Sequence, residues 1–231
     1  MEDTSVPNIV TAVLADYRGY DTMFETAVIF SAGIACLFLL RQMKRKKTDF
    51  RLYRHTATGI TFRIEKGGKL PPTAKEFERI DGLWTPYDLI IKTTGRFIIP
   101  FIQIFALYVI AHGHHSPGGG FQGGVILGAS FVLFAISHDL RSALNRMSEK
   151  LTAFFCTLGV YIYAGTGALC ILLGANFLDY SALATILFVD PVTARSHGIL
   201  IVEIGVGIAV MAVMVILYYN LVSAGKFDEG L

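Results

Sequence analysis

Long apolar segments recur along this chain, and five of them are long enough to cross a lipid bilayer. A membrane-spanning helix needs about 20 mostly apolar residues. The chain meets this requirement at residues 22–40, 97–113, 121–137, 151–174 and 198–221. The second helix is expected to begin at least one turn earlier, near Leu89. The pattern predicts an all-α integral membrane protein with five transmembrane helices.

Two shorter segments share the apolar character but cannot span. Residues 182–190 are too few to cross the hydrocarbon, so we expect them to be interfacial or re-entrant. Residues 7–22 carry apolar side chains at helical spacing. We expect this second segment to lie in the outer interface or to pack on a neighbouring subunit.

The composition agrees with a membrane protein. Of the 231 residues, 53% are hydrophobic and 16% are charged, and the mean hydropathy is +0.55. A soluble domain usually has about 25% charged residues. The net charge of +2 says little by itself. The lipid bilayer is therefore the expected environment, and no nucleic-acid partner is expected.

The distribution of basic residues predicts the topology. If the five helices alternate in direction, all of the 20 Lys and Arg residues except Arg18 and Arg195 fall on one side. Basic residues concentrate on the cytoplasmic side of membrane proteins. The N-terminus is then outside and the C-terminus inside. One helix more or fewer would mix the charges, so the count supports five.

A polar segment divides the chain into two membrane parts. Residues 1–45 contain one helix, residues 46–88 form a cytoplasmic polar linker, residues 89–222 contain four helices, and residues 223–231 form a cytoplasmic tail. Within the linker, residues 59–70 have the pattern of a small hairpin. The basic residues of the linker either reflect ordinary positive-inside topology or bind anionic lipid headgroups or a partner subunit.

The stretch HGHHSPGGGFQGG, residues 112–124, joins two of the predicted helices. The spacing HxHH matches no zinc signature, and the glycines are not followed by the GK[ST] of a phosphate-binding loop. A tight turn fits best, because Gly118, Gly119 and Gly120 permit positive φ angles. Small residues at Gly123, Gly124 and Gly128 favour close helix contact. No metal or cofactor is expected.

The three histidines of this loop leave two interpretations open. His112, His114 and His115 titrate near neutral pH, so they could tune the outer mouth of a proton or cation path. Alternatively, headgroups, water or backbone groups satisfy them at the interface.

Carboxylates at membrane depth are the strongest functional signal. An acid in a spanning helix is costly and marks a functional site by default. Glu203 lies six residues into the last predicted helix, and Glu25 lies one turn after Asp21. We expect Glu25 and Glu203 to lie on an ion path, with Asp21 secondary, since Asp21 could instead cap its helix with Thr22.

Lys92 and Arg96 are one turn apart near the cytoplasmic end of the second helix. Their side chains either extend to the headgroups or pair with an acid of a neighbouring helix.

Two stretches resemble subunits of one transporter family. YVIAHGHHSPGGGFQGGVILGASFVL (108–133) and VEIGVGIAVMAV (202–213) resemble the B subunit (MnhB-type) of Mrp-type multisubunit Na⁺/H⁺ antiporters, with Glu203 as the acid of the last helix. His115 stands where that family usually has asparagine. NIVTAVLADYRGYDTMFETAVIFSAG (8–33) resembles the C-terminal end of the large A subunit, which in membrane-bound hydrogenases is a separate E-type subunit.

The resemblance implies a B-subunit-like domain fused to an A-subunit-like segment, in the inner (plasma) membrane. It implies a subunit of a Na⁺/H⁺ antiporter module, either a stand-alone Mrp antiporter or part of a redox-driven complex. Its partners would be other Mrp-type subunits and, in the second case, hydrogenase-like or complex I-like redox subunits. The chain itself would not be an enzyme. The alternative is a structural adaptor without its own ion path, linking antiporter-like subunits to a redox module.

The topology can be tested with an epitope tag inserted between residues 48 and 80. Because the basic residues place this segment in the cytoplasm, antibody is expected to bind the tag only after the cells are permeabilised. Binding to intact cells would contradict the topology.

Overall fold

The five predicted membrane helices are confirmed in a computed structural model, which describes residues 4–42, 50–65, 76–79, 89–115, 118–138 and 140–223. Five helices are long and apolar enough to span: α2 (Gly19–Gln42), α3 (Leu89–Ala111), α4 (Gly120–His138), α6 (Glu149–Leu172) and α8 (Pro191–Ser223). The membrane part of the protein is therefore all-α, with five candidate spanning helices.

Helix α8 begins earlier than its apolar pattern predicts. It starts at Pro191 rather than near residue 198, because proline suits the first position of a helix, where its missing N–H is not needed. Glu203 is therefore the thirteenth residue of the helix and not the sixth. At 33 residues the helix is about 50 Å long, well beyond the roughly 30 Å of hydrocarbon.

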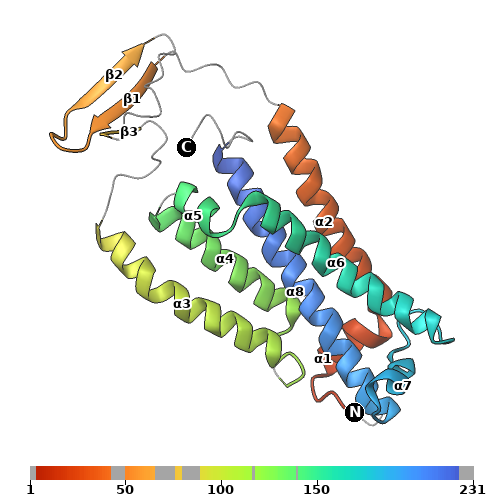
Figure 1. The fold of residues 1–231 in the computed structure, drawn as a ribbon. Helices are drawn as coiled ribbons and strands as arrows, with labels where there is room; N and C mark the ends of the chain where they lie inside the picture. Colours follow the sequence, from red (N-terminus) through yellow and green to blue (C-terminus); the bar gives the residue numbers. More distant parts are fainter. Residues whose placement is uncertain are drawn as a thin grey trace.

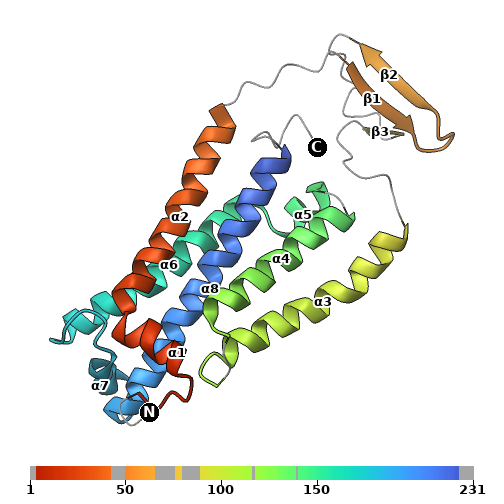
Figure 2. The same ribbon diagram turned by 180° about the vertical axis from the view of Figure 1, so that it is seen from behind.

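Helix α8 is also the centre of the bundle. Its most apolar window is 72% buried, compared with 11% for α2 and 17% for α3. Helices α2, α4 and α6 pack around it, and α3 packs chiefly against α4 (Figures 1 and 2). The outer faces of α2 and α3 are thus left exposed in the single chain.

The opening segment packs partly against its own chain, and the predicted place of residues 7–22 in the outer interface or on a neighbouring subunit stays a prediction. The segment forms α1 (Ile9–Ala12) and a π-helical turn, η1 (Val13–Tyr17), before α2 begins. The turn contacts α8, and Val6, Thr11 and Ala15 are buried. The apolar residues of this segment are therefore used partly inside the protein's own core.

The short apolar segment 182–190 does not cross the membrane region. It is built from η2 (Tyr180–Leu183) and α7 (Ala184–Leu187), which pack against the beginning of α8. A further short helix, α5 (Leu140–Arg146), follows α4.

A small sheet lies between α2 and α3 in the sequence. Strands β1 (Phe50–His55), β2 (Thr61–Glu65) and β3 (Phe77–Arg79) are antiparallel in the order β2-β1-β3. The sheet lies beyond the end of the bundle where α2 ends and α3 begins (Figure 1). The observed hairpin turns at residues 56–60, earlier than the predicted one, whose second arm lies outside the described residues.

Glycines let α4 and α6 touch the backbone of α8. A Cβ on Gly159 of α6 would lie 2.5 Å from the Gly205 carbonyl oxygen and 2.6 Å from the Ala209 nitrogen. A Cβ on Gly124 of α4 would lie 2.5 Å from the Gly207 carbonyl oxygen. Small residues at helix interfaces allow this approach inside a membrane.

Substituting Gly159 tests this packing, with Gly165 of the same helix as the control. Gly159→Ala is expected to destabilise the protein by about 1–3 kcal/mol, because the new methyl group overpacks the contact with α8. Gly165 has only its own helix's Tyr161 nearby, at 3.8 Å, so Gly165→Ala should be neutral or stabilising by up to about 1 kcal/mol. Thermal midpoints of the detergent-extracted protein measure both effects. Equal midpoints would contradict the backbone contact.

Candidate functional site

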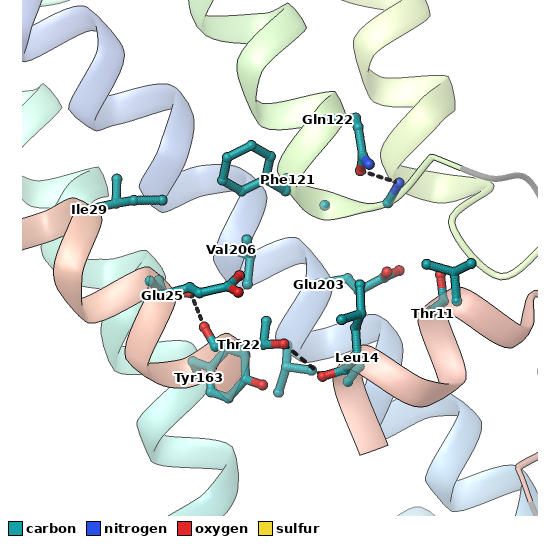
Figure 3. A pocket seen from close by; sticks show the side chains of 16 residues that line it. Thr11, Leu14, Thr22, Glu25, Ile29, Phe121, Gln122, Tyr163, Glu203 and Val206 are labelled. Atoms are coloured by element: carbon teal, nitrogen blue, oxygen red, sulfur yellow. Dashed lines mark hydrogen bonds between the residues drawn. The ribbon is translucent and has the colours of Figure 1, made fainter. Parts of the chain in front are cut away.

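A cavity of about 270 Å³ opens where the N-terminal segment, α2, α4, α6 and α8 meet. Both Glu25 and Glu203 line it, together with the hydroxyl-bearing residues Thr22, Thr26 and Tyr163. Figure 3 shows Glu25 reaching toward Val206, while Glu203 reaches toward the side where Thr11 lies. The two carboxylates predicted from the sequence therefore share one cavity, contributed by two different helices.

Three glycines at the junction of α3 and α4, Gly113, Gly119 and Gly120 (the glycine loop), lie around the Glu203 carboxyl group. A Cβ added to Gly119 would lie 2.6 Å from Glu203 Oε1, and one added to Gly113 would collide with Oε2. A Cβ on Gly120 would overlap the Glu203 backbone carbonyl oxygen. At Gly120 only glycine leaves room for the backbone of α8, whereas a methyl group at Gly113 or Gly119 would displace the Glu203 carboxyl group.

This finding corrects the predicted reason for the glycines. The turn was expected to use positive φ angles, but neither Gly119 nor Gly120 adopts one. The two residues are needed for space rather than for an unusual backbone conformation. Such a requirement arises only from the tertiary contact with α8.

Polar residues of the N-terminal segment lie beside Glu203. Thr11, which carries a hydroxyl group, lines the same cavity as Glu203. The same hydroxyl donates to the Gly113 carbonyl at 2.9 Å, and Asn8 Nδ2 donates to Thr11 Oγ1 at 2.9 Å. Glu203 Oε2 is buried and has no hydrogen-bond partner among the described residues.

Asp21 does not share the environment of Glu25. It forms a salt bridge with Arg18, with Nη2 and Oδ2 2.7 Å apart, on an exposed part of the surface. It is not among the residues that line the cavity, whereas Glu25 is. The helix begins at Gly19, so Asp21 lies in its first turn and does not cap it. Its predicted secondary role on the ion path thus rests on its closeness to Glu25 in the sequence alone.

Buried hydroxyl groups hold the N-terminal segment in place. The Tyr163 hydroxyl donates to the Gly19 carbonyl at 2.8 Å, and the Tyr180 hydroxyl donates to the Ala15 carbonyl at 3.1 Å. Thr22 donates to the Leu14 carbonyl at 2.7 Å. Burial raises the pKa of Tyr180, so this hydroxyl remains a protonated donor at neutral pH. Thr11, Tyr163 and Tyr180 were not predicted from the sequence.

The three loop histidines have different environments. His114 Nε2 is 2.8 Å from the Ser196 carbonyl oxygen, which ties the loop to α8. His112 stacks on Tyr108 with ring centroids 4.1 Å apart, and His115 is exposed. None of the three lines the cavity. In the described part of the chain, no group of three or more His, Cys, Asp or Glu side chains is placed to hold a metal ion.

Lys92 and Arg96 lie at the far end of α3 from the glycine loop. Gly95 between them packs against Ser137 of α4, and both cations interact electrostatically with the neighbouring His138. They therefore do not pair with Glu25 or Glu203.

The C-terminal part of the chain matches antiporter subunits in sequence. Residues 90–216 match the family described as a domain related to the MnhB subunit of Na⁺/H⁺ antiporter. An antiporter subunit from Staphylococcus haemolyticus, mnhB2, is 30% identical over 131 residues, which are 54% of this chain and 92% of that protein.

Two solved structures share the fold. One is the membrane-bound sulfane sulfur reductase, an archaeal respiratory membrane complex, with 26% identity and a TM-score of 0.64 over 96% of this chain and 80% of that chain. The other is the Mrp complex of a Dietzia species, with 23% identity and a TM-score of 0.63. That match covers 99% of this chain but 22% of the other, so this chain corresponds to a part of a much longer one.

Substituting His114 tests whether this histidine anchors the loop, with the exposed His115 as the control. His114→Ala is expected to cost about 0.5–1.5 kcal/mol, the usual net value of one hydrogen bond. His115→Ala should leave the thermal midpoint unchanged. If both variants unfold like the wild type, the contact with Ser196 does not stabilise the loop.

Proposed function

Because the chain belongs to the family of domains related to the MnhB subunit of Na⁺/H⁺ antiporters, we propose that it helps form the ion translocation path of a monovalent cation (Na⁺)/proton antiporter module. The chain is a multi-pass membrane subunit of an antiporter-type complex, and so a transporter component rather than an enzyme. In this proposal the subunit itself contacts the transported ions.

One observation carries this proposal: two acids from different helices line a single cavity within the membrane region. Glu25 lies on α2 and Glu203 on α8, and both helices are candidate membrane spans. Ionisable side chains at this depth are costly and usually mark ion pathways. The threonine and tyrosine hydroxyls that line the same cavity supply polar groups for the passage of protons or hydrated cations.

We further propose that residues 1–45 derive from the end of an A-type subunit. The part of this chain that matches mnhB2 is 54% of its length and covers 92% of that protein. The family match begins only at residue 90. The N-terminal helix α2 is therefore additional to a stand-alone B-type subunit. Residues 46–88 would then be the linker, residues 89–222 the B-type domain and residues 223–231 the tail. The last segment lies outside the described residues, apart from Ser223.

The partners follow from the same comparisons. Other Mrp-type antiporter subunits are the first expectation, because the Dietzia structure is an Mrp complex. Hydrogenase-like or complex I-like redox subunits are the second, because the sulfane sulfur reductase is a respiratory complex. In either setting the plasma membrane is the proposed location, with His112, His114 and His115 at the outer mouth.

A structural adaptor is the alternative function. Helices α2 and α3 are only 11% and 17% buried in their most apolar windows, so two long apolar faces are available to neighbouring subunits. An adaptor would need these faces but no carboxylates on an ion path.

Substitution of the two acids tests the proposal. In the purified, reconstituted complex, Glu203→Gln and Glu25→Gln are each expected to lower Na⁺-dependent transport on the order of 100-fold. That is the scale at which loss of an essential proton-transfer group acts. The measurement is Na⁺ flux into proteoliposomes, with assembly checked on native gels.

Glu76→Gln is the matched control. Glu76 precedes β3 and its side chain is 80% exposed, outside the membrane helices. This variant should transport normally. Normal transport in all three variants, with intact assembly, would favour the adaptor.

A further inference from the structure

The Glu203 carboxyl group lies in surroundings that suit a neutral acid. Its Oε2 atom is buried, and the atoms around the carboxyl group include those of Gly113 and Gly119. Burying an ionised carboxylate without partners costs far more than burying the protonated form, so such groups usually take up a proton instead.

No cation compensates this carboxyl group within the described ranges. Arg18 is paired with Asp21, and Arg195 lies 3.9 Å from Asp179. The other titratable groups lining the cavity are Glu25 of α2 and Tyr163 of α6, and neither supplies a positive charge. His114 is directed to the Ser196 carbonyl.

The recorded hydrogen bonds of Thr11 leave no hydroxyl proton for an ionised Glu203. A threonine hydroxyl has one proton and two lone pairs. In the recorded bonds that proton goes to the Gly113 carbonyl, while Asn8 donates to the oxygen. The remaining lone pair can accept a proton from a neutral Glu203.

The surroundings of Glu203 offer few free oxygen ligands for a metal cation. Hard cations bind through several oxygen ligands at once. Two oxygen atoms near Glu203 are already engaged: the Gln122 amide oxygen accepts from the Gly119 N–H, and the Gly113 carbonyl accepts from both Asn8 and Thr11. A proton needs only a single lone pair.

From this enclosure, we infer that Glu203 is the proton site of the subunit and holds a proton, not Na⁺, in the conformation described. This assignment deepens the proposed function and rests on it for its role in transport. The step itself is simple: one proton joins the carboxylate and leaves again, with no other reactant.

Infrared difference spectroscopy of the purified complex tests the assignment. The spectrum of the wild type minus that of Glu203→Gln at pH 7 is expected to show the C=O stretching band of a protonated carboxylic acid. The band should be the same in NaCl and in KCl at equal ionic strength. Glu76→Gln is the control, and its difference spectrum should contain only carboxylate bands, because Glu76 is exposed.

Two results would overturn the inference. The first is a difference spectrum for Glu203→Gln that contains only carboxylate bands, since Glu203 would then be ionised. The second is a protonated band that disappears when Na⁺ replaces K⁺ at constant pH, since Na⁺ would then bind at Glu203.

A second measurement needs no variant, in case Glu203→Gln fails to assemble. Dicyclohexylcarbodiimide reacts with protonated carboxyl groups in apolar sites, and mass spectrometry locates the adduct. We expect modification of Glu203 at pH 7 in the wild-type complex, to the same extent in Na⁺ and in K⁺. Protection by Na⁺, or a complete lack of modification of Glu203, would refute the proton site.

The transport measurement and the protonation measurement can fail independently of each other. If Glu203→Gln abolishes transport but Na⁺ displaces the proton, the ion path stands and the proton assignment is wrong. If Glu203 is protonated but both acid variants transport normally, the assignment stands and the ion path lies elsewhere.

Discussion

The contact between the glycine loop and the backbone of α8 is the constraint on which the cavity depends. Gly120 lies so close to the Glu203 carbonyl that a single methyl group would not fit between them, and Gly124 meets Gly207 in a similar way. Two backbones in contact leave no freedom to insert a side chain or to shift by one residue. The Glu203 carboxyl group is therefore held between Gly113 and Gly119 rather than exposed to lipid, where it would be costly.

Much of the fold could be predicted because the decisive signals are local. The length of each apolar segment and the segregation of Lys and Arg identify five helices without any knowledge of their contacts. Glu25 and Glu203 were identifiable for the same reason, since acids in such segments are rare. The start of α8 was placed too late because the polar residues before residue 198 continue the helix beyond its apolar part.

The features that could not be predicted depend on distant pairs. The Tyr163 and Tyr180 hydroxyls bond to carbonyls 144 and 165 residues away, and nothing local marks them as partners of the N-terminal segment. The glycines were predicted to permit positive φ angles in the turn, and this reason was wrong. The atoms that exclude a side chain there belong to α8. The Arg18–Asp21 pair was visible at its i, i+3 spacing, yet Asp21 was considered only as a neighbour of Glu25 or Thr22.

The polar segment between α2 and α3 joins the two walls of the cavity in one polypeptide. Glu25 belongs to the part before this segment, and Glu203 to the part after it. Their meeting is therefore an intramolecular event, governed by an effective concentration rather than by the amounts of two separate proteins. Equal stoichiometry of the two walls is guaranteed at synthesis, and neither wall can be inserted into a complex without the other.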